Sequence, residues 1–397
     1  MDFSLLFSPV YIGKKKLKNR IALAPTGMGT ADDHGGVTDQ TLCHYTARAK
    51  GGVGMVIVEH TMANLKYGLE GIGALAFHRD RNLAGMYDLA NAIKAFDALA
   101  VVQLSIGLGR EPGPGLDSFG PSPVPVEFAA GSMPKGLTVF EGITAPPPRE
   151  LSIQEIEELE HLYVASALRI QSAGFDGIEI HGGHGYALSA FLSPHANRRN
   201  DRYGGSFEKR MTLALNLVRR CRKALGDRFI LGFRISGDEH IPGGRSLSET
   251  CEIVQILEKE GIDYIHLTSG TLESKCFTFP DKKSVLLPEA ESVKKSVSIP
   301  VICPNIHDPD VAVDAVKSGK IDVVSLSRSL LADPEWPTKV KEGRIQDIQK
   351  CILCNTCLKT LFTGFQTRCA VNPNVGRERF MPEYFPPVRK RGETIPH

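Results

Sequence analysis

The stretch FDGIEIHGGHGY, residues 175–186, decides the fold and marks the candidate site. Residues 175–180 form a short apolar run with β-branched isoleucines, which is typical of a buried strand. His181, His184 and Tyr186 follow, separated by glycines that permit tight turns. Because ligands of parallel α/β proteins bind at the carboxyl ends of the strands, we expect these three side chains to be catalytic. The alternative is that His181 caps the strand and Tyr186 packs under a loop.

Strand-like and helix-like segments alternate along the rest of the chain. The strand candidates are residues 20–25, 54–59, 100–105, 175–181, 229–236, 262–268, 299–304 and 322–327. Amphipathic helical segments lie between them, and the one at 151–173 begins with Ser152 and Glu155, the pattern of a capping box. This alternation predicts a (β/α)8 TIM barrel over residues 1–342. A doubly wound sheet is the alternative, but no GxGxxG follows a first strand.

One connection is too long for a passive loop. Residues 106–150 are rich in glycine and proline and follow the third predicted strand. We expect a lid or a substrate-binding segment over the barrel mouth, with an irregular surface loop as the alternative.

The predicted strand ends gather polar residues suited to a large planar ligand. Arg234 could stabilise negative charge at one end of a ring, as a reduced flavin carries. Arg328, with backbone N–H groups after the last two strands, could hold a phosphate. The candidate cofactor-binding residues at these ends are Pro25, Thr26, Gly27, Glu59, Gln103, Arg234, Asn305, Ser327 and Arg328.

A second signal is the cysteine-rich segment CILCNTCLKTLFTGFQTRC, residues 351–369. Cys351, Cys354, Cys357 and Cys369 have the spacing C-x2-C-x2-C-x11-C. Four thiolates can form a structural zinc site, but zinc ribbons usually pair two separated C-x2-C knuckles. Three close cysteines and a distant one are typical of an iron–sulfur cluster. We therefore predict a [4Fe–4S] cluster in a small C-terminal extension, residues 343–397.

The composition predicts a cytoplasmic protein. The net charge of +2 gives no reason to expect a nucleic acid or an anionic membrane as partner. No apolar stretch approaches the roughly 20 residues needed to span a bilayer. At the N-terminus the basic run follows the apolar segment, which is the wrong order for a signal peptide. Nine cysteines, an odd number, do not suggest a disulfide framework.

Five segments together resemble the old yellow enzyme superfamily of NADH:flavin oxidoreductases. They are LKNRIALAPTG (17–27), VVQLSIGLGR (101–110), GFDGIEIHGGHGYALSAFLSPHANRRNDRYGGSFEKR (174–210), LGFRISGDE (231–239) and SLSRSLLADPEWPTKVKEGR (325–344). They are most similar to the subgroup that contains 2,4-dienoyl-CoA reductase and trimethylamine dehydrogenase. The resemblance implies FMN at the C-terminal mouth of the barrel, and it also implies a [4Fe–4S] cluster at these cysteines.

The resemblance also implies roles for single residues. His181 and His184 would bind the substrate carbonyl or approach the flavin, and Tyr186 would deliver a proton opposite the hydride. The residues implied to contact FMN are Pro25, Thr26 and Gly27 at the flavin edge, Gln103 at the pyrimidine ring, Arg234 near N1 and C2=O, and Arg328 at the phosphate.

Several positions depart from this subgroup, among them Gly27, residues 268–271 and His60. Gly27 stands about where trimethylamine dehydrogenase has the cysteine that binds FMN covalently, so we expect no covalent bond. Residues 268–271 lack the histidine that dienoyl-CoA reductase pairs with its tyrosine. His60 stands where a small residue is commoner, and it could tune the flavin or simply fill space.

We therefore expect FMN-dependent reduction of the activated C=C of an α,β-unsaturated carbonyl compound or enoyl thioester, with hydride from flavin N5 and a proton from Tyr186. The alternative is an amine dehydrogenase or N-demethylase that passes electrons from FMN through the cluster. Larger members of the subgroup continue, soon after the cluster, into FAD- and NAD(P)H-binding folds. The electron donor is thus either NAD(P)H acting directly or a separate electron-transfer protein or reductase subunit. The chain could also form a homo-oligomer.

Overall fold

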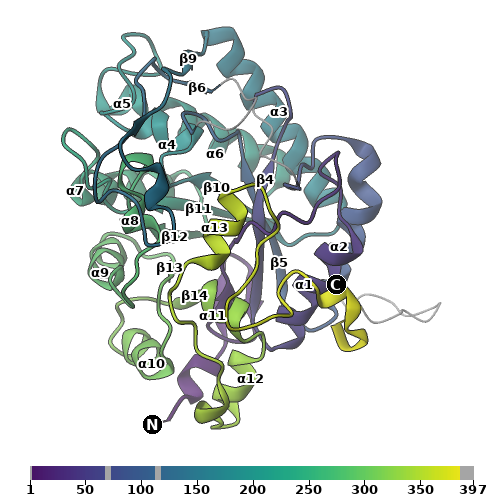
Figure 1. Ribbon diagram of the computed structural model, residues 1–397. Coiled ribbons are helices and arrows are strands. Elements are labelled where there is room, and N and C mark those ends of the chain that lie inside the picture. Colours follow the sequence, from purple (N-terminus) through teal and green to yellow (C-terminus); the bar gives the residue numbers. More distant parts are fainter. Residues whose placement is uncertain (1, 68–72, 112–117, 385–397) are drawn as a thin grey trace.

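The computed structural model describes residues 2–67, 73–111 and 118–384 and contains a closed barrel of parallel strands (Figure 1). In order around the barrel the strands are β3 (Ile21–Leu23), β4 (Met55–Met62), β5 (Leu99–Ser105), β10 (Gly177–Gly182), β11 (Ile230–Ser236), β12 (Tyr264–Thr268), β13 (Val301–Cys303) and β14 (Val323–Leu326). Strand β14 pairs with β3 and closes the ring. All eight strand candidates are therefore confirmed, and with them the (β/α)8 barrel.

Helices cover the outside of the barrel, as its strands require because they are buried on both faces. Those that follow the barrel strands are α1 (Asp39–Lys50), α2 (Leu83–Lys94), α3 (Ile153–Ser172), α6 (Thr212–Leu225), α7 (Leu247–Lys259), α9 (Leu287–Ser296), α10 (Pro309–Lys317), α11 (Arg328–Ala332) and α12 (Trp336–Lys341). The capping box predicted at the start of α3 is present, since Ser152 and Glu155 bond reciprocally. The helix expected between residues 207 and 225 is interrupted at Met211, between α5 (Phe207–Arg210) and α6.

A short hairpin closes the end of the barrel opposite the mouth. Its strands β1 (Val10–Ile12) and β2 (Lys15–Leu17) pair antiparallel. The buried side chains of Ile12 and Leu17 belong to the cluster that fills this end of the barrel, with Met55, Ile57 and Tyr264. The hairpin thus completes the inner core at the bottom and leaves the carboxyl ends of the strands for the site.

The long connection after β5 folds over the mouth. It contains the strand pairs β6 (Phe119–Gly120) with β9 (Arg149–Glu150) and β7 (Glu127–Phe128) with β8 (Ile143–Thr144). Two short helices at the same end of the barrel are α4 (Ala187–Leu192) after β10 and α8 (Lys275–Thr278) after β12. Residues 112–117 of the predicted lid lie outside the described part of the chain. The 3-10 helices are η1 (Ser4–Phe7), η2 (Asp80–Asn82), η3 (Thr138–Phe140), η4 (Leu272–Ser274), η5 (Ile345–Asp347), η6 (Glu378–Phe380) and η7 (Pro382–Tyr384).

The cysteine-rich segment carries α13 (Thr356–Phe362), drawn yellow in Figure 1, and lies against the loop after β3. Thr367 binds this segment to the loop after β3. The N–H of Thr367 donates to the Met28 carbonyl at 2.9 Å, and the hydroxyl of Thr367 donates to the Gly27 carbonyl at 2.7 Å. Further on, Glu378 forms a buried ion pair with Arg48 of α1 at 2.5 Å. The extension is therefore docked on the barrel by hydrogen bonds and a buried charge pair. Its residues 385–397 lie outside the described residues, among which no helix is long and apolar enough to span a membrane.

Candidate active site

Four aromatic side chains meet at the mouth of the barrel. His181 is the fifth residue of β10, and His184 and Tyr186 follow it in the turn before α4. The ring centroid of His181 lies 5.2 Å from that of His184 and 5.4 Å from that of Tyr186. His60 of β4 stacks on Tyr186, with a distance of 5.3 Å between the ring centroids. The structure thus brings together the three predicted catalytic side chains and adds His60 to them.

The backbone between these rings explains the glycines. His184 and Gly185 have φ of +63° and +79°, so the chain makes a left-handed turn between the two predicted functional residues. A Cβ on Gly183 would lie 2.8 Å from Cγ2 of Thr268, which leaves no room for a larger residue. His184 is fixed within this turn, because its N–H donates to Ser236 Oγ at 3.1 Å and its Nε2 lies 2.7 Å from Thr268 Oγ1.

Burial sets the protonation of the cluster. It lowers the pKa values of His181 and His184 well below 6.5, and the charge of Arg234 lowers both further. Both imidazoles are therefore neutral at pH 7, each with one N–H donor and one acceptor. Burial raises the pKa of Tyr186 well above 10, and its carboxylate neighbour Glu111 raises that pKa further. Tyr186 is consequently a phenol at pH 7, as a proton donor must be.

Beneath the rings lies a buried polar network. Register places His181, Arg234 and His266 side by side on three adjacent strands. Nη1 of Arg234 lies 3.1 Å from Nδ1 of His266, which lies 2.8 Å from Glu179 Oε2. Burial alone would raise the pKa of Glu179, but His266 and Arg234 hold it below its usual value. The amide of Gln103 donates to Glu179 at 2.7 Å. Glu179 therefore holds Gln103 directly and Arg234 through His266.

Two buried donors or acceptors of this region remain without a partner. Nδ1 of His181 and Nε of Arg234 form no hydrogen bond with any described residue. Because buried polar groups are normally satisfied, such atoms at a barrel mouth suit a ligand with polar edges. The ring system of FMN has such edges, so the residues present here fit it.

The ends of β13 and β14 form a second polar region. Nη1 of Arg328 donates to Asn355 Oδ1 at 2.8 Å, and Ser327 Oγ accepts from Thr26 at 2.7 Å. Nε2 of His307 and Nδ2 of Asn355 are buried without a hydrogen-bond partner among the described residues. Burial and the nearby Arg328 lower the pKa of His307 to about 3. Unused donors beside a guanidinium are suited to a phosphate.

Two predicted cofactor residues, Asn305 and Glu59, form hydrogen bonds within the chain. The side chain of Asn305 accepts from the N–H of Val285 at 3.0 Å and donates to the Lys282 carbonyl at 3.1 Å. These bonds hold the loop before α9 in place. The φ of Asn305 is +66°, in the left-handed region, just after the end of β13.

Glu59 lies under the loop after β3. Its Oε2 accepts from the N–H of Met28 at 2.8 Å, and its Oε1 accepts from the hydroxyl of Tyr45 at 3.3 Å. Burial raises the pKa of Glu59 to about 8, although these hydrogen bonds oppose the shift. A Cβ on Gly27 would lie 3.8 Å from Glu59 and 2.9 Å from Leu361 of α13. The loop of Pro25, Thr26 and Gly27 is thus held between Glu59 and the cysteine-rich segment.

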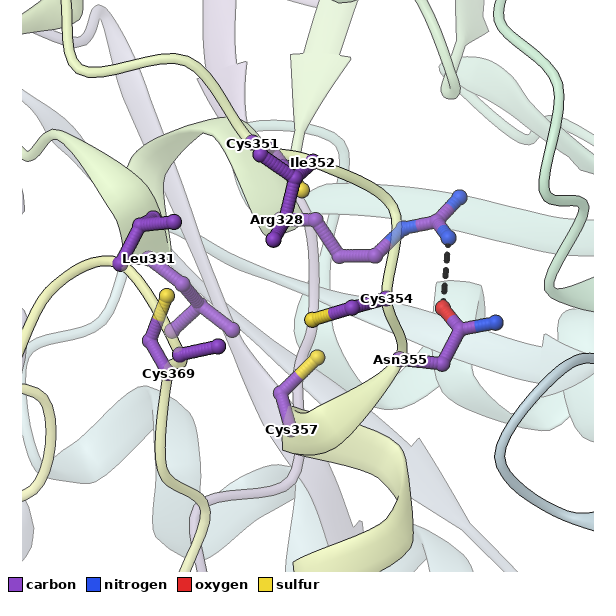
Figure 2. A pocket seen from close by; sticks show the side chains of 10 residues that line it. Arg328, Leu331, Cys351, Ile352, Cys354, Asn355, Cys357 and Cys369 are labelled. Carbon is purple, nitrogen blue, oxygen red and sulfur yellow. Dashed lines mark hydrogen bonds between the residues drawn. The ribbon is translucent and has the colours of Figure 1, made fainter.

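The four cysteines of that segment line one pocket. Cys351, Cys354, Cys357 and Cys369 surround it together with Arg328, and Figure 2 shows Arg328 turned towards Asn355. All four thiols are free. Burial raises the pKa of Cys357 to about 11. Among the described residues no group of three or more His, Cys, Asp or Glu side chains is arranged to hold a metal ion. Four thiols around a single pocket are nevertheless the donor set that an iron–sulfur cluster uses.

A buried ion pair beside Tyr186 was not predicted from the sequence. Lys275 of α8 pairs with Glu111 of the loop after β5. They lie 164 positions apart, so no spacing rule connects them. The available signal was that each follows a predicted barrel strand, in the loops where functional residues concentrate.

Comparison with known proteins identifies a family that matches most of the chain. Residues 5–347 match the NADH:flavin oxidoreductase / NADH oxidase family. The NADH oxidase of Thermoanaerobacter brockii is 39% identical over 98% of this chain and 59% of its own. The cinnamate reductase of Clostridium sporogenes is 32% identical over 95% of this chain and 59% of its own.

Solved structures agree with this match. A complex of 2-naphthoyl-CoA reductase with 2-naphthoyl-CoA superposes with a TM-score of 0.86 and 30% identity, over 96% of this chain and 58% of that one. The chain spans less than two thirds of the length of each of these three proteins.

Proposed function

The chain belongs to the NADH:flavin oxidoreductase / NADH oxidase family of flavin-dependent oxidoreductases, and we propose that it reduces the activated C=C bond of an α,β-unsaturated carbonyl compound or enoyl thioester. The observation that carries this proposal is the cluster of His181, His184 and Tyr186 at the barrel mouth, with two neutral imidazoles and one phenol. The similarity to a cinnamate reductase supports the same reaction class.

Each residue of the cluster has a separate task in this reaction. His184 takes part in a hydrogen bond at Nε2 with Thr268, which leaves its other nitrogen for a substrate carbonyl. Nδ1 of His181 is buried without a partner among the described residues and can take the second position. Hydrogen bonds to the carbonyl oxygen stabilise the negative charge that develops there. Tyr186 then donates its proton to the α-carbon.

FMN would supply the hydride for the β-carbon when it is bound. We assign its ring system to Gln103, Arg234 and the loop of Pro25, Thr26 and Gly27, and its phosphate to the region of Ser327 and Arg328. The unpartnered Nε of Arg234 and the donors beside Arg328 support this placement. NAD(P)H is the proposed electron donor.

We further propose that Cys351, Cys354, Cys357 and Cys369 bind a [4Fe–4S] cluster, as in the subgroup with 2,4-dienoyl-CoA reductase and trimethylamine dehydrogenase. The shared pocket of the four thiols supports this assignment. We take residues 343–397 as the cluster-binding extension of a barrel formed by residues 1–342. Replacing Cys354 with Ala should remove iron from anaerobically purified protein, while Cys251→Ala, outside the segment, should not. Unchanged iron content in C354A would reject the ligand assignment.

A cluster that transfers single electrons also calls for an electron-transfer partner. We propose a separate electron-transfer protein or reductase subunit that exchanges electrons with the extension. Its test is the reduction of FMN in the wild type and in C354A by NADH and by a reduced ferredoxin. A defect with ferredoxin alone supports the partner, whereas equal rates in both proteins would reject it.

The proton-donor role is tested with Tyr186→Phe. The variant should oxidise reduced FMN with an enone about 100-fold more slowly, since general acids contribute roughly 10²–10⁴ in rate. Reduction of FMN by NADH should stay within about twofold of the wild type, because no proton is delivered in that half-reaction. Equal losses in both half-reactions would reject the role. A parallel screen with amines tests the alternative reaction.

A further inference from the structure

The buried ion pair of Glu111 and Lys275 needs an explanation. These side chains belong to residues only 8% and 5% exposed, and they contact each other directly. Removing two charges from water costs several kcal/mol per ion, which their mutual attraction often fails to repay. The pair lies on two loops at the barrel mouth and takes no part in the barrel core. Its position beside the proposed proton donor suggests a role in the reaction.

Two close backbone approaches place the pair. A Cβ on Gly109 would lie 2.7 Å from the backbone of Ala187, so the loop that carries Glu111 is pressed against the residue after Tyr186. A Cβ on Gly185 would lie 2.7 Å from the N–H nitrogen of Leu272, so the loop that carries Lys275 is pressed against the residue before Tyr186. Tyr186 is thus held between the two loops.

The surroundings of the pair are apolar. Nζ of Lys275 lies 4.5 Å from the ring centroid of Phe362 and 5.8 Å from that of Phe128. Tyr186, Phe128 and Leu272 belong to one buried cluster, against which Phe362 packs. Lys275 therefore has Glu111 as its charged partner, with two aromatic rings close to its ammonium group.

The other titratable groups around Tyr186 are the histidines of the site and a second ion pair. His60, His181 and His184 surround the ring from the site. Further along the same two loops, Arg110 and Glu273 form an ion pair of their own at 2.5 Å. Glu111 is the neighbouring carboxylate that raises the pKa of the Tyr186 phenol. Glu111 is consequently the group through which a proton can reach the phenol.

A buried proton donor must be recharged after each turnover. Tyr186 is 9% exposed, and a substrate placed to receive its proton would cover that remaining surface. Once its proton has gone to the substrate, the phenolate is a strong base in an apolar place. An ionised carboxylate is only an acceptor and has no proton of its own to return. The ammonium of Lys275 holds three protons and touches that carboxylate.

We propose that Glu111 and Lys275 are the proton supply of Tyr186. The O–H bond of Tyr186 breaks as the C–H bond at the α-carbon forms. A proton then moves from Nζ of Lys275 to the carboxylate of Glu111 and from Glu111 to the phenolate oxygen. The neutral amine of Lys275 takes a proton from water. One proton passes from solvent to substrate, and no electrons move along this path.

This inference rests on the proposed reduction of an activated alkene, and its test separates the two. In the FMN-loaded enzyme, Glu111→Gln and Lys275→Met should slow repeated turnover of an enone about tenfold, less than the loss of the acid itself. The first oxidation of reduced flavin, which uses the proton already on Tyr186, should keep the wild-type rate. Reduction of flavin by NADH and the FMN content per chain should not change. The control is Glu249→Gln, which breaks the Arg210–Glu249 pair outside the barrel and should change neither half-reaction.

Two further comparisons distinguish proton supply from structural support. In a Tyr186→Phe background, Lys275→Met should cause no additional slowing, whereas a structural role would slow both backgrounds equally. Lys275→Arg keeps the positive charge, but arginine does not release a proton in proteins, so this variant should be as slow as Lys275→Met. The slow variants should also show an increased solvent isotope effect.

Wild-type rates with Lys275→Arg would overturn the relay, and so would equal slowing of both half-reactions. If Y186F is slow but the pair variants are not, this inference fails and the proposed function stands. If no activated alkene oxidises the reduced wild-type enzyme, the proposed function fails and this inference fails with it.

Discussion

Replacing Glu59 with Gln should stabilise the protein at alkaline pH but not at acid pH. Burial raises the pKa of Glu59 to about 8, from 4.5 for an exposed glutamate. The folded protein therefore holds this carboxyl neutral up to about pH 8, whereas the unfolded chain ionises it above about pH 4.5. Stability due to this residue is fully present below pH 4.5 and is lost as the pH rises towards 8. Glutamine cannot ionise and keeps the acceptor for the Met28 N–H.

The size of this effect follows from the same two values. At about 1.36 kcal/mol for each pH unit, the difference between 4.5 and about 8 corresponds to at most about 5 kcal/mol. For a 397-residue chain the entropy of unfolding is about 0.8 kcal/mol/K, so 5 kcal/mol corresponds to about 6 °C in Tm. The Tm of E59Q minus that of the wild type should therefore increase by up to about 6 °C between pH 4 and pH 8.5.

Differential scanning calorimetry at five or so pH values between 4 and 9 measures this difference. Glu127→Gln is the control, since it removes an exposed carboxylate, and its Tm difference should not follow the same curve. A Tm difference for E59Q that does not change with pH would refute the reasoning, because it would mean that the folded protein accommodates the ionised carboxylate. A difference that falls with rising pH would have the wrong sign and would refute it as well.

Three further outcomes are expected. Leu17→Ala should lower the free energy of unfolding by about 2–5 kcal/mol, because Leu17 is fully buried in the hairpin that closes the barrel opposite the mouth. Lys16→Ala, at an exposed position of the same hairpin, should cost little, and equal small effects of both changes in thermal unfolding would contradict this packing. Ser152→Ala should cost about 1 kcal/mol by removing the capping box of α3, and no loss in the same assay would argue against that cap. Arg234→Lys should raise the Kd for FMN about tenfold, since a hydrogen bond to a charged group is worth about 1.5–3 kcal/mol, and wild-type affinity in a fluorescence titration would contradict its placement at the flavin.

The barrel strands could be predicted because each is a continuous apolar run between turn-forming residues. The run at 175–181 became Gly177–Gly182, and the run at 54–59 became Met55–Met62. The errors lie at the ends, where pairing with neighbours decides how far a strand continues. The capping box of α3 could be predicted because Ser152 and Glu155 are three positions apart. The hairpin of β1 and β2 could not be predicted, because its two strands have three residues each and are too short to show a periodic pattern.

The candidate site was predictable where it is local in sequence. His181, His184 and Tyr186 lie within one turn, so the position of β10 sufficed to place them at the mouth. Contacts between distant segments could not be predicted. Glu59 turns towards Tyr45 and the Met28 N–H, and Lys275 meets Glu111 only after the barrel has closed. Such pairs depend on tertiary packing and have no signature in spacing or composition.

The most direct test of the account is a single turnover under anaerobic conditions. Purified protein is analysed for acid-released flavin, reduced with one equivalent of NADH or dithionite, and mixed with an α,β-unsaturated carbonyl compound while the flavin absorbance is followed. The account predicts one FMN per chain and rapid return of oxidised flavin, with the saturated compound as product and slower return in Y186F. Absence of FMN, or reduced flavin that persists with every alkene while an amine reduces the oxidised enzyme, would contradict it.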